Sequence, residues 1–190
     1  MEKRIKYRVS HTGQDWHSPD CYGCGIDNTY GLHADFRFYE PTGEVRFNYT
    51  PKSFQEGAPG YMHGGIIASL LDEAQGVLCF HLGHLVMTDQ LNVSYRHAIS
   101  LKNEISVKCW IDSVEKRRIH TKASIADASG TILAESSGKW YVLNERIARR
   151  LFGRQYSEQK FQDLKEILEG NRKRAKTIRK KLKTKNHDKI

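Results

Sequence analysis

The sequence predicts an α+β protein in which a curved antiparallel β-sheet surrounds one long central helix. Residues 60–80 carry apolar side chains at helical spacing. Residues 87–143 carry four successive runs with the two-residue alternation of half-buried strands, and residues 32–50 carry two more. Because a helix and a sheet each bury one apolar face, such a sheet must curl round the single helix between its strands.

Three segments are expected before the central helix. Residues 1–20 are polar and are assigned to an N-terminal arm, and residues 21–31 are rich in turn-forming residues. Alternating apolar side chains then predict two strands over residues 32–50, joined as a hairpin by Pro41-Thr42-Gly43.

The predicted central helix has two distinct stripes at a spacing of 3.6 residues per turn. The apolar stripe is suited to packing on a sheet and consists of Ile67, Leu70, Leu71, Ala74 and Leu78. The second stripe consists of small residues round one carboxylate: Gly65, Ser69, Asp72 and Gly76. Small side chains allow a second chain or a ligand to come close, and a carboxylate in such a setting requires a partner or a chemical role.

The start of this helix is a second candidate feature. His63-Gly64-Gly65 leaves backbone N–H groups of the first turn without helical acceptors. Because two of these residues lack side chains, a substrate oxygen can reach the N–H groups. The helix would then hold a carbonyl-polarising group and an acid or base about two turns apart. The alternative is a tight turn followed by a structural polar residue, and spacing alone does not separate the two.

Four strands are expected after the helix, over residues 87–95, 105–111, 119–125 and 132–143. The third and fourth are separated by the strong turn signal Asp127-Ala128-Ser129-Gly130. The composition then changes beyond Asn144. We therefore divide the chain into the arm, a domain over residues 21–144 and a C-terminal helical extension over residues 145–190.

The C-terminal extension contains the net charge of the protein. Helical spacing predicts an amphipathic helix over residues 157–169, which Gly170-Asn171 should stop or kink. The basic tail, residues 171–190, has ten basic residues and one acidic residue, whereas the rest of the chain has 21 of each, so the net charge of +9 belongs to the tail. Either a basic helix meets nucleic acid or an anionic membrane, or the tail is solvated with general affinity for polyanions. No aromatic residue follows Phe161, so base stacking is not supported.

The four cysteines give no clear metal site. Cys79 and Cys109 fall in the central helix and a strand and are expected to be buried thiols. Cys21-Tyr-Gly-Cys24 has the spacing of a metal knuckle, with His17 upstream, but a structural zinc site usually needs a second ligand pair, and none is evident. We therefore expect a turn with buried thiols rather than a metal site or a redox pair. No signal peptide and no apolar run of about 18 residues is seen, so a soluble cytoplasmic protein is expected.

At this point the residues resemble a known family, the hotdog-fold acyl-CoA thioesterases of the PaaI-like branch within the 4-hydroxybenzoyl-CoA thioesterase superfamily. The resemblance covers residues 21–143. It rests on four ordered motifs: Cys21-Tyr-Gly-Cys24-Gly25 with Asn28 and Gly31-Leu32, Gly57-Ala-Pro-Gly60-Tyr-Met-His63-Gly64-Gly65, Leu70-Leu71-Asp72-Glu73-Ala74, and Val86-Met87-Thr88 with Leu91-Asn92-Val93-Ser94-Tyr95.

The resemblance implies an acyl-CoA or aryl-CoA thioester hydrolase that acts without a cofactor or metal. It also implies a homodimer, in some members a tetramer, with two sites at the subunit boundary. The implied catalytic residues are Gly65 as oxyanion donor, Asp72 as general base or nucleophile, Thr88 as the residue holding the water or Asp72, and His63 as an orienting group. Substrate contacts are implied for Gly64, Met87 and Asn92.

Some features leave alternatives open. Glu73, about 100° round the helix from Asp72, is the rival carboxylate, with a surface or dimer-edge ion pair as its expected role. Arg96-His97-Ala98 departs from the Arg-Pro common in the family, which affects expected coenzyme contacts. A non-catalytic acyl-CoA sensor whose basic tail binds nucleic acid or anionic membrane is the second function class. A hotdog hydratase or dehydratase is the third, but its His and carboxylate motif is not found.

Overall fold

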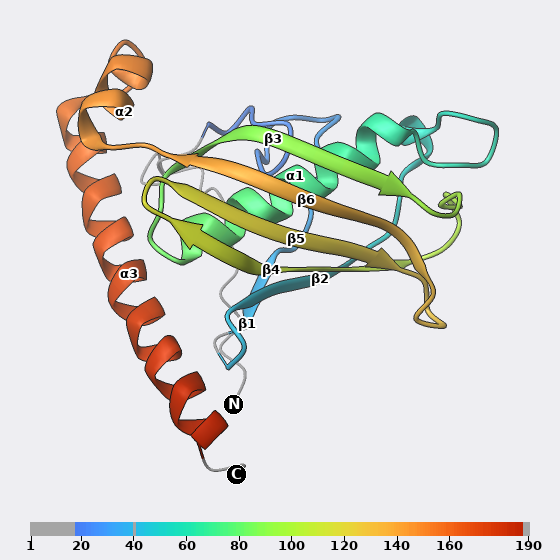
Figure 1. Cartoon of the computed structure of the whole chain (residues 1–190). Coiled ribbons are helices and arrows are strands. Elements are labelled where there is room, and N and C mark those ends of the chain that lie inside the picture. The colour runs from blue at the N-terminus through green and yellow to red at the C-terminus, as the bar shows by residue number, and fades with distance from the viewer. Residues whose placement is uncertain (1–17, 40, 188–190) are drawn as a thin grey trace.

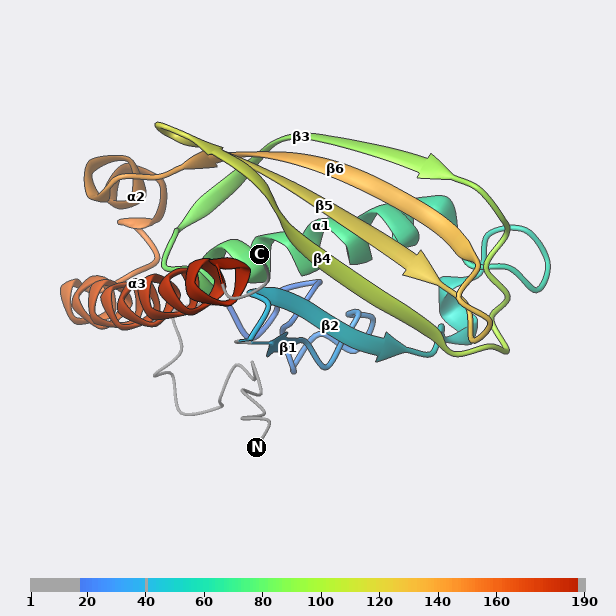
Figure 2. The ribbon, with the colours of Figure 1, turned by 60° about the horizontal axis from the view of Figure 1, so that its bottom comes forward.

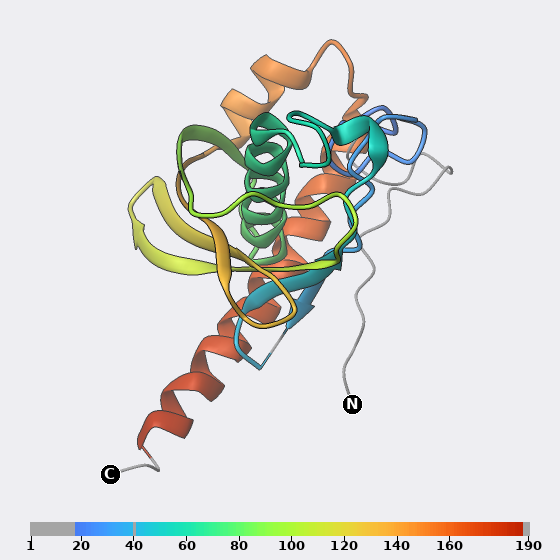
Figure 3. The ribbon, with the colours of Figure 1, turned by 90° about the vertical axis from the view of Figure 1, so that its right-hand side faces the viewer.

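The computed structural model describes residues 18–39 and 41–187, with side chains described as far as residue 177. In this part of the chain a six-stranded antiparallel sheet curves round helix α1 (Gly64–His81), as Figures 1 and 3 show. The predicted fold class is confirmed. Most of the predicted arm over residues 1–20, including His17, lies outside the described residues.

The sheet has the order β1-β2-β4-β5-β6-β3, so β3, which follows α1 directly, lies at one edge (Figure 2). Its strands are β1 (Arg37–Tyr39), β2 (Glu44–Tyr49), β3 (Val86–Tyr95), β4 (Ile105–Glu115), β5 (Arg118–Ala126) and β6 (Ile132–Val142). All neighbouring pairs are antiparallel. The predicted hairpin forms, although β1 is shorter than the run of alternating residues that predicted it.

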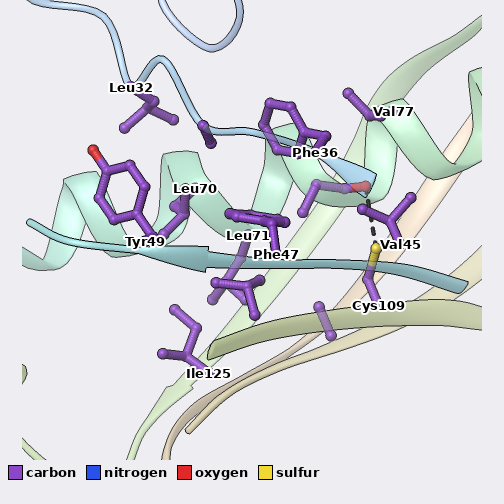
Figure 4. Packing of buried hydrophobic residues seen from close by; sticks show 14 of the residues in the cluster. Leu32, Phe36, Val45, Phe47, Tyr49, Leu70, Leu71, Val77, Cys109 and Ile125 are labelled. Atoms are coloured by element: carbon purple, nitrogen blue, oxygen red, sulfur yellow. Dashed lines mark hydrogen bonds between the residues drawn. The ribbon is translucent and has the colours of Figure 1, made fainter. Parts of the chain in front are cut away.

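The apolar stripe of α1 packs against the inner face of the sheet, as predicted. Leu70, Leu71 and Leu78 are fully buried there with Val45 and Ile125 of the strands, and Figure 4 shows part of this packing. The alternating residues before β1 also point inward, so that this segment covers α1 from the other side. Cys79 and Cys109 are buried as expected, and the Cys109 thiol donates to the Ala74 carbonyl at 3.1 Å.

Two helices follow the sheet, although the sequence predicted only one, over residues 157–169. Helix α2 (Glu145–Phe152) was not predicted; its N-cap is Asn144, whose side-chain oxygen accepts from the Ile147 N–H at 2.9 Å. Helix α3 (Glu158–His187) begins where expected but continues through Gly170-Asn171 without stopping. The predicted stop was therefore wrong.

Tertiary contacts explain why α3 continues. Asn171 is buried, and its side-chain amide donates to the Phe80 carbonyl at 2.9 Å, while Arg172 donates to the Gly83 carbonyl at 3.0 Å. These bonds use carbonyls at the C-terminal end of α1 that have no acceptor role inside the helix. Asn171, a residue type that is common at helix ends, here holds α3 against α1.

None of the helices within residues 18–39 and 41–187 combines the length and apolar character needed to cross a bilayer.

Candidate active site

Asp72 lies in the middle of α1 and faces edge strand β3. The hydroxyl of Thr88 donates to Asp72 Oδ1 at 3.0 Å. This contact joins the acidic residue of the small-residue stripe to the strand that follows the helix. The sequence predicted both residues as site residues, and the structure brings them together.

The carboxyl group of Asp72 is partly buried, and its pKa reflects this. Burial raises the pKa above its usual value, and the hydrogen bond from Thr88 lowers it again in part. Burial destabilises the ionised carboxylate, so it accepts a proton more readily than an exposed carboxylate does. The side chain is therefore suited to acid–base chemistry.

A hollow of about 340 Å³ opens beside Asp72 and Thr88. Its walls come from α1 and β3 and from the end of β6, and they include Gly76, Phe80, Met87 and Trp140. A Cβ atom on Gly76 would lie 3.6 Å from the Trp140 ring, which is an ordinary van der Waals contact, so this face of the helix lies against the ring. Met87, a predicted substrate contact, lines this hollow and is 46% exposed.

A buried polar chain fixes the floor of this hollow. The Trp140 indole N–H donates to Thr121 Oγ1 at 2.7 Å, and the Thr121 hydroxyl donates to Gln75 Oε1 at 2.6 Å. Gln75 in turn donates to Ser136 Oγ and to the Leu71 carbonyl, each at 2.9 Å. The sequence analysis missed Gln75, Thr121 and Trp140 as parts of the site's surroundings, because only the folded sheet brings them under α1.

The start of α1 is capped in a way that the sequence did not reveal. His63 is the N-cap, and its Nδ1 accepts a hydrogen bond from the Gly65 N–H at 2.9 Å. The expected oxyanion donor is therefore already bonded to its own histidine. A substrate oxygen can use this N–H only when the His63 ring moves away, because the ring and the oxygen compete for one donor.

A second hollow, of about 640 Å³, opens at this end of the helix. His63 and Gly64 line it together with Tyr95 and the segment Arg96-His97-Ala98. The Tyr95 hydroxyl donates to the Gly64 carbonyl at 3.0 Å and so ties the end of β3 to the start of α1. Tyr95 was part of a motif but was not predicted as a site residue.

The two hollows lie at separate positions along α1. Seven residues separate Gly65 from Asp72, which corresponds to about 10 Å along a helix axis. A carbonyl bound at the Gly65 N–H and attacked by a group at Asp72 would have to lie within about 3 Å of both. One α1 helix does not provide both groups for the same carbonyl.

The other two candidates have different surroundings. Asn92, expected to contact substrate, is exposed on β3 opposite Ser137 and lines neither hollow. Glu73 lines the hollow beside Asp72, and its side chain faces the loop over residues 21–25, where a Cβ atom on Gly23 would lie 2.2 Å from its carboxyl carbon. The ion pair expected for Glu73 at the surface or at a dimer edge stays a prediction.

Comparison with known proteins agrees with this fold. Residues 59–134 match the model of the thioesterase superfamily. An acyl-coenzyme A thioesterase, THEM4 of Xenopus laevis, is 31% identical over 85 residues, which is 45% of this chain and 38% of that protein. Acyl-coenzyme A thioesterase THEM5 of Homo sapiens is 29% identical over 104 residues, 53% of this chain and 42% of that protein. The chain thus spans about two fifths of the length of these relatives.

Solved structures show the same architecture. A thioesterase superfamily protein has a TM-score of 0.57 and 27% identity, covering 65% of this chain and 62% of its own. PaaI of E. coli has a TM-score of 0.51 at 16% identity, covering 54% and 75%. A Streptococcus mutans protein bound to acetyl-CoA has a TM-score of 0.52 at 16% identity, covering 54% and 83%, and these last two speak to the fold alone.

The sheet wrapped round one long helix is therefore the hotdog fold. Residues 59–134 of this chain match the thioesterase superfamily model, and the chain is similar in sequence to the THEM4 and THEM5 thioesterases and in fold to PaaI.

Proposed function

We propose that this chain hydrolyses acyl-CoA or aryl-CoA thioesters to the free acid and coenzyme A. The observation that carries the proposal is the hydrogen bond from Thr88 to the partly buried Asp72, at the wall of a hollow in a thioesterase superfamily domain. The relatives named as acyl-coenzyme A thioesterases support the substrate class.

The chemistry requires a nucleophile and a site for the developing oxyanion. In the general-base route, Asp72 takes a proton from water, the resulting hydroxide attacks the thioester carbon, and the C–S bond then breaks to release the thiol of coenzyme A. In the alternative route, Asp72 itself attacks and forms an anhydride that water hydrolyses. In both, the Gly65 N–H binds the oxyanion, and one such donor is typically worth about 3–4 kcal/mol.

We propose further that each site combines two chains. The separation of Gly65 and Asp72 along α1 supports this arrangement, since a second copy would bring its own helix start to the Asp72 hollow. Edge strand β3 supports it too: Thr88 and Met87 lie on this strand, most of its residues are exposed, and an edge strand readily pairs with another chain. A two-fold dimer is the commonest assembly that would serve.

Release of the coenzyme A thiol from a panel of acyl-CoA and aryl-CoA substrates tests the function. We expect turnover by the wild type and a loss of at least ~100-fold in Asp72→Ala with the dimer retained, because the proton acceptor or nucleophile is gone. Asp112→Ala is the matched control, since that exposed carboxylate pairs with Lys122 on the sheet.

Two outcomes would count against the proposal. Equal turnover in Asp72→Ala would remove Asp72 from the mechanism. Tight binding of acyl-CoA without turnover by the wild type would favour the sensor function instead.

A further inference from the structure

The loop before β1 and helix α1 bring three metal-ligating side chains together, and one of them, Glu73, also lines the hollow beside Asp72. Cys21 and Cys24 come from the loop, and Glu73 comes from the middle of α1, beside Asp72 in sequence. Their two sulfur atoms and a carboxylate oxygen all lie within 4.8 Å of one another. The cysteine spacing alone had predicted no metal, because the third ligand is about fifty residues away in the chain.

The loop is shaped to hold these ligands in place. The Gly25 N–H donates to the Cys21 carbonyl at 2.9 Å, and a Cβ atom on Gly25 would lie 2.4 Å from the Cys21 nitrogen. Gly23 lies directly on the Glu73 carboxyl group, so a larger residue there would displace the Glu73 side chain. Tyr22 anchors the loop through its carbonyl, which accepts from the Leu32 N–H at 2.8 Å. The ligands are therefore held by backbone packing.

We propose that Cys21, Cys24 and Glu73 bind one thiophilic divalent cation, of which Zn²⁺ is the natural example. Zinc binds thiolate sulfur at about 2.3 Å and carboxylate oxygen at about 2.0–2.2 Å in a tetrahedral arrangement. Ligand atoms within 4.8 Å of one another need only a small contraction to reach that geometry. Water completes the fourth position, because Cys21 and Glu73 are both partly exposed.

The charge of the cluster explains why a cation suits it. Two thiolates and a carboxylate would place three negative charges in a part-buried site, which is costly without compensation. A divalent cation bound by the three ligands supplies that compensation.

The proposed cation fastens the opening loop to α1 and does not take part in hydrolysis. It contacts Glu73, which lies on a different side of the helix from Asp72. Its binding should stabilise the folded chain, because the ligands are brought together only on folding.

Titration of the full-length protein with Co²⁺ tests the site. The protein is first freed of metal by a chelator under reducing conditions and desalted. We expect one Co²⁺ per chain, with the thiolate-to-cobalt charge-transfer absorption and the intense visible bands of tetrahedral cobalt, all removed by Zn²⁺. Zn²⁺ should also raise the melting temperature.

The variants distinguish this site from chance binding. Cys21→Ser should abolish the charge-transfer bands, and Glu73→Gln should weaken binding at least tenfold. Asp72→Asn, the neighbouring carboxylate on the same helix, should bind Co²⁺ as the wild type does. Cys21 and Glu73 are partly exposed, so both variants should fold, and circular dichroism checks that they do.

Three results would overturn the proposal. The first is a wild type without charge-transfer absorption in a large excess of Co²⁺. The second is unchanged binding in both Cys21→Ser and Glu73→Gln. The third is loss of the bands in Asp72→Asn, which would place the cation at the other carboxylate.

Discussion

Asp72 is subject to two opposing effects that act on one carboxyl group. Burial between α1 and β3 raises its pKa, and the Thr88 hydroxyl lowers it by stabilising the carboxylate. In the proposed reaction the carboxylate must accept a proton or attack, so only the ionised form is active. The balance between burial and Thr88 therefore sets the acidic limb of the rate profile.

Thr88→Val tests how much the Thr88 hydroxyl lowers the pKa of Asp72. Removing the hydroxyl removes a hydrogen bond to a charged group, worth about 1.5–3 kcal/mol, so kcat/KM should fall roughly tenfold or more. The pKa of Asp72 should rise, because the variant loses the hydrogen bond that lowers it and keeps the burial that raises it. The acidic limb of kcat/KM should therefore move to higher pH. Ser94→Ala on the same strand is the control. An acidic limb that stays in place or moves to lower pH would contradict the role of Thr88.

His81 is a second buried titratable group, at the end of α1. Its ring stacks on Phe38 with centroids 5.2 Å apart. Burial, and next the positive charge of Arg174, lower its pKa from 6.5 to about 4. The folded protein thus binds a proton at His81 less readily than the unfolded chain, so stability is present above pH 6.5 and is lost as pH falls towards 4.

We expect His81 to contribute up to about 3 kcal/mol to this loss of stability in acid. His81→Phe keeps a flat ring against Phe38 and cannot be protonated, so its free energy of unfolding should vary less between pH 6.5 and 4. Urea unfolding across this pH range measures the difference. His97→Gln, at an exposed position, should retain the wild-type dependence. Equal slopes in wild type and His81→Phe would exclude the effect.

At the scale of elements, two glycines near the junction of α1 and α3 make a matched pair. Gly170 lies inside α3 with open space round its Cβ position, whereas Gly83 has φ +86° and its Cβ would lie 2.7 Å from the Leu168 carbonyl. Gly170→Ala should stabilise the protein by about 0.5–1 kcal/mol through better helix propensity. Gly83→Ala should destabilise it. Urea unfolding measures both, and destabilisation by Gly170→Ala would show that α3 bends there.

The order of elements could be predicted, because each depends on a local period. The alternation in β3 to β6 and the apolar stripe of α1 are visible in the sequence, and both formed as expected. The continuation of α3 could not be predicted, since it depends on Asn171 reaching the Phe80 carbonyl, about ninety residues away. Local signals for a helix end were outweighed by tertiary hydrogen bonds.

The candidate site was predictable to a similar extent. Helix spacing and family motifs pointed to Asp72 and Thr88, and the structure places the two side chains in contact, while their catalytic roles stay predictions. The hydrogen bond from the Gly65 N–H to His63 was missed, because no periodic signal in the sequence shows which side chain accepts from the backbone at a helix start. The direction of Glu73 was missed because it depends on how the opening loop packs.

The two helices after the sheet contribute buried residues to the core of the molecule. Ala175 of α3 is buried in the main cluster, and Phe161 and Leu164 pack with Phe80 of α1. The first residues of the basic tail therefore belong to the body, and Figure 1 shows the remainder of α3 reaching past the sheet. Among the described residues, these helices pack at the C-terminal end of α1, and β3 has a neighbouring strand on one side alone.

That open edge is where a second copy would complete the site, and subunit mixing can show it. Asp72→Ala removes the acid, and Gly65→Pro removes the N–H donor of the first turn together with its hydrogen bond to His63. Each variant alone should be inactive. If each site takes Asp72 from one chain and Gly65 from the other, a mixed dimer carries both lesions in one site and leaves the other intact.

Equal mixing after denaturation and refolding should then restore about a quarter of wild-type activity, because half of the dimers are mixed and each has one intact site of two. Sites built within single chains would stay inactive in the mixture, since every chain carries a lesion. Refolding each variant by itself controls for reversion of the lesion during the procedure. Recovered activity therefore requires both an assembly of two chains and a carbonyl held between the helix start of one and the acid of the other.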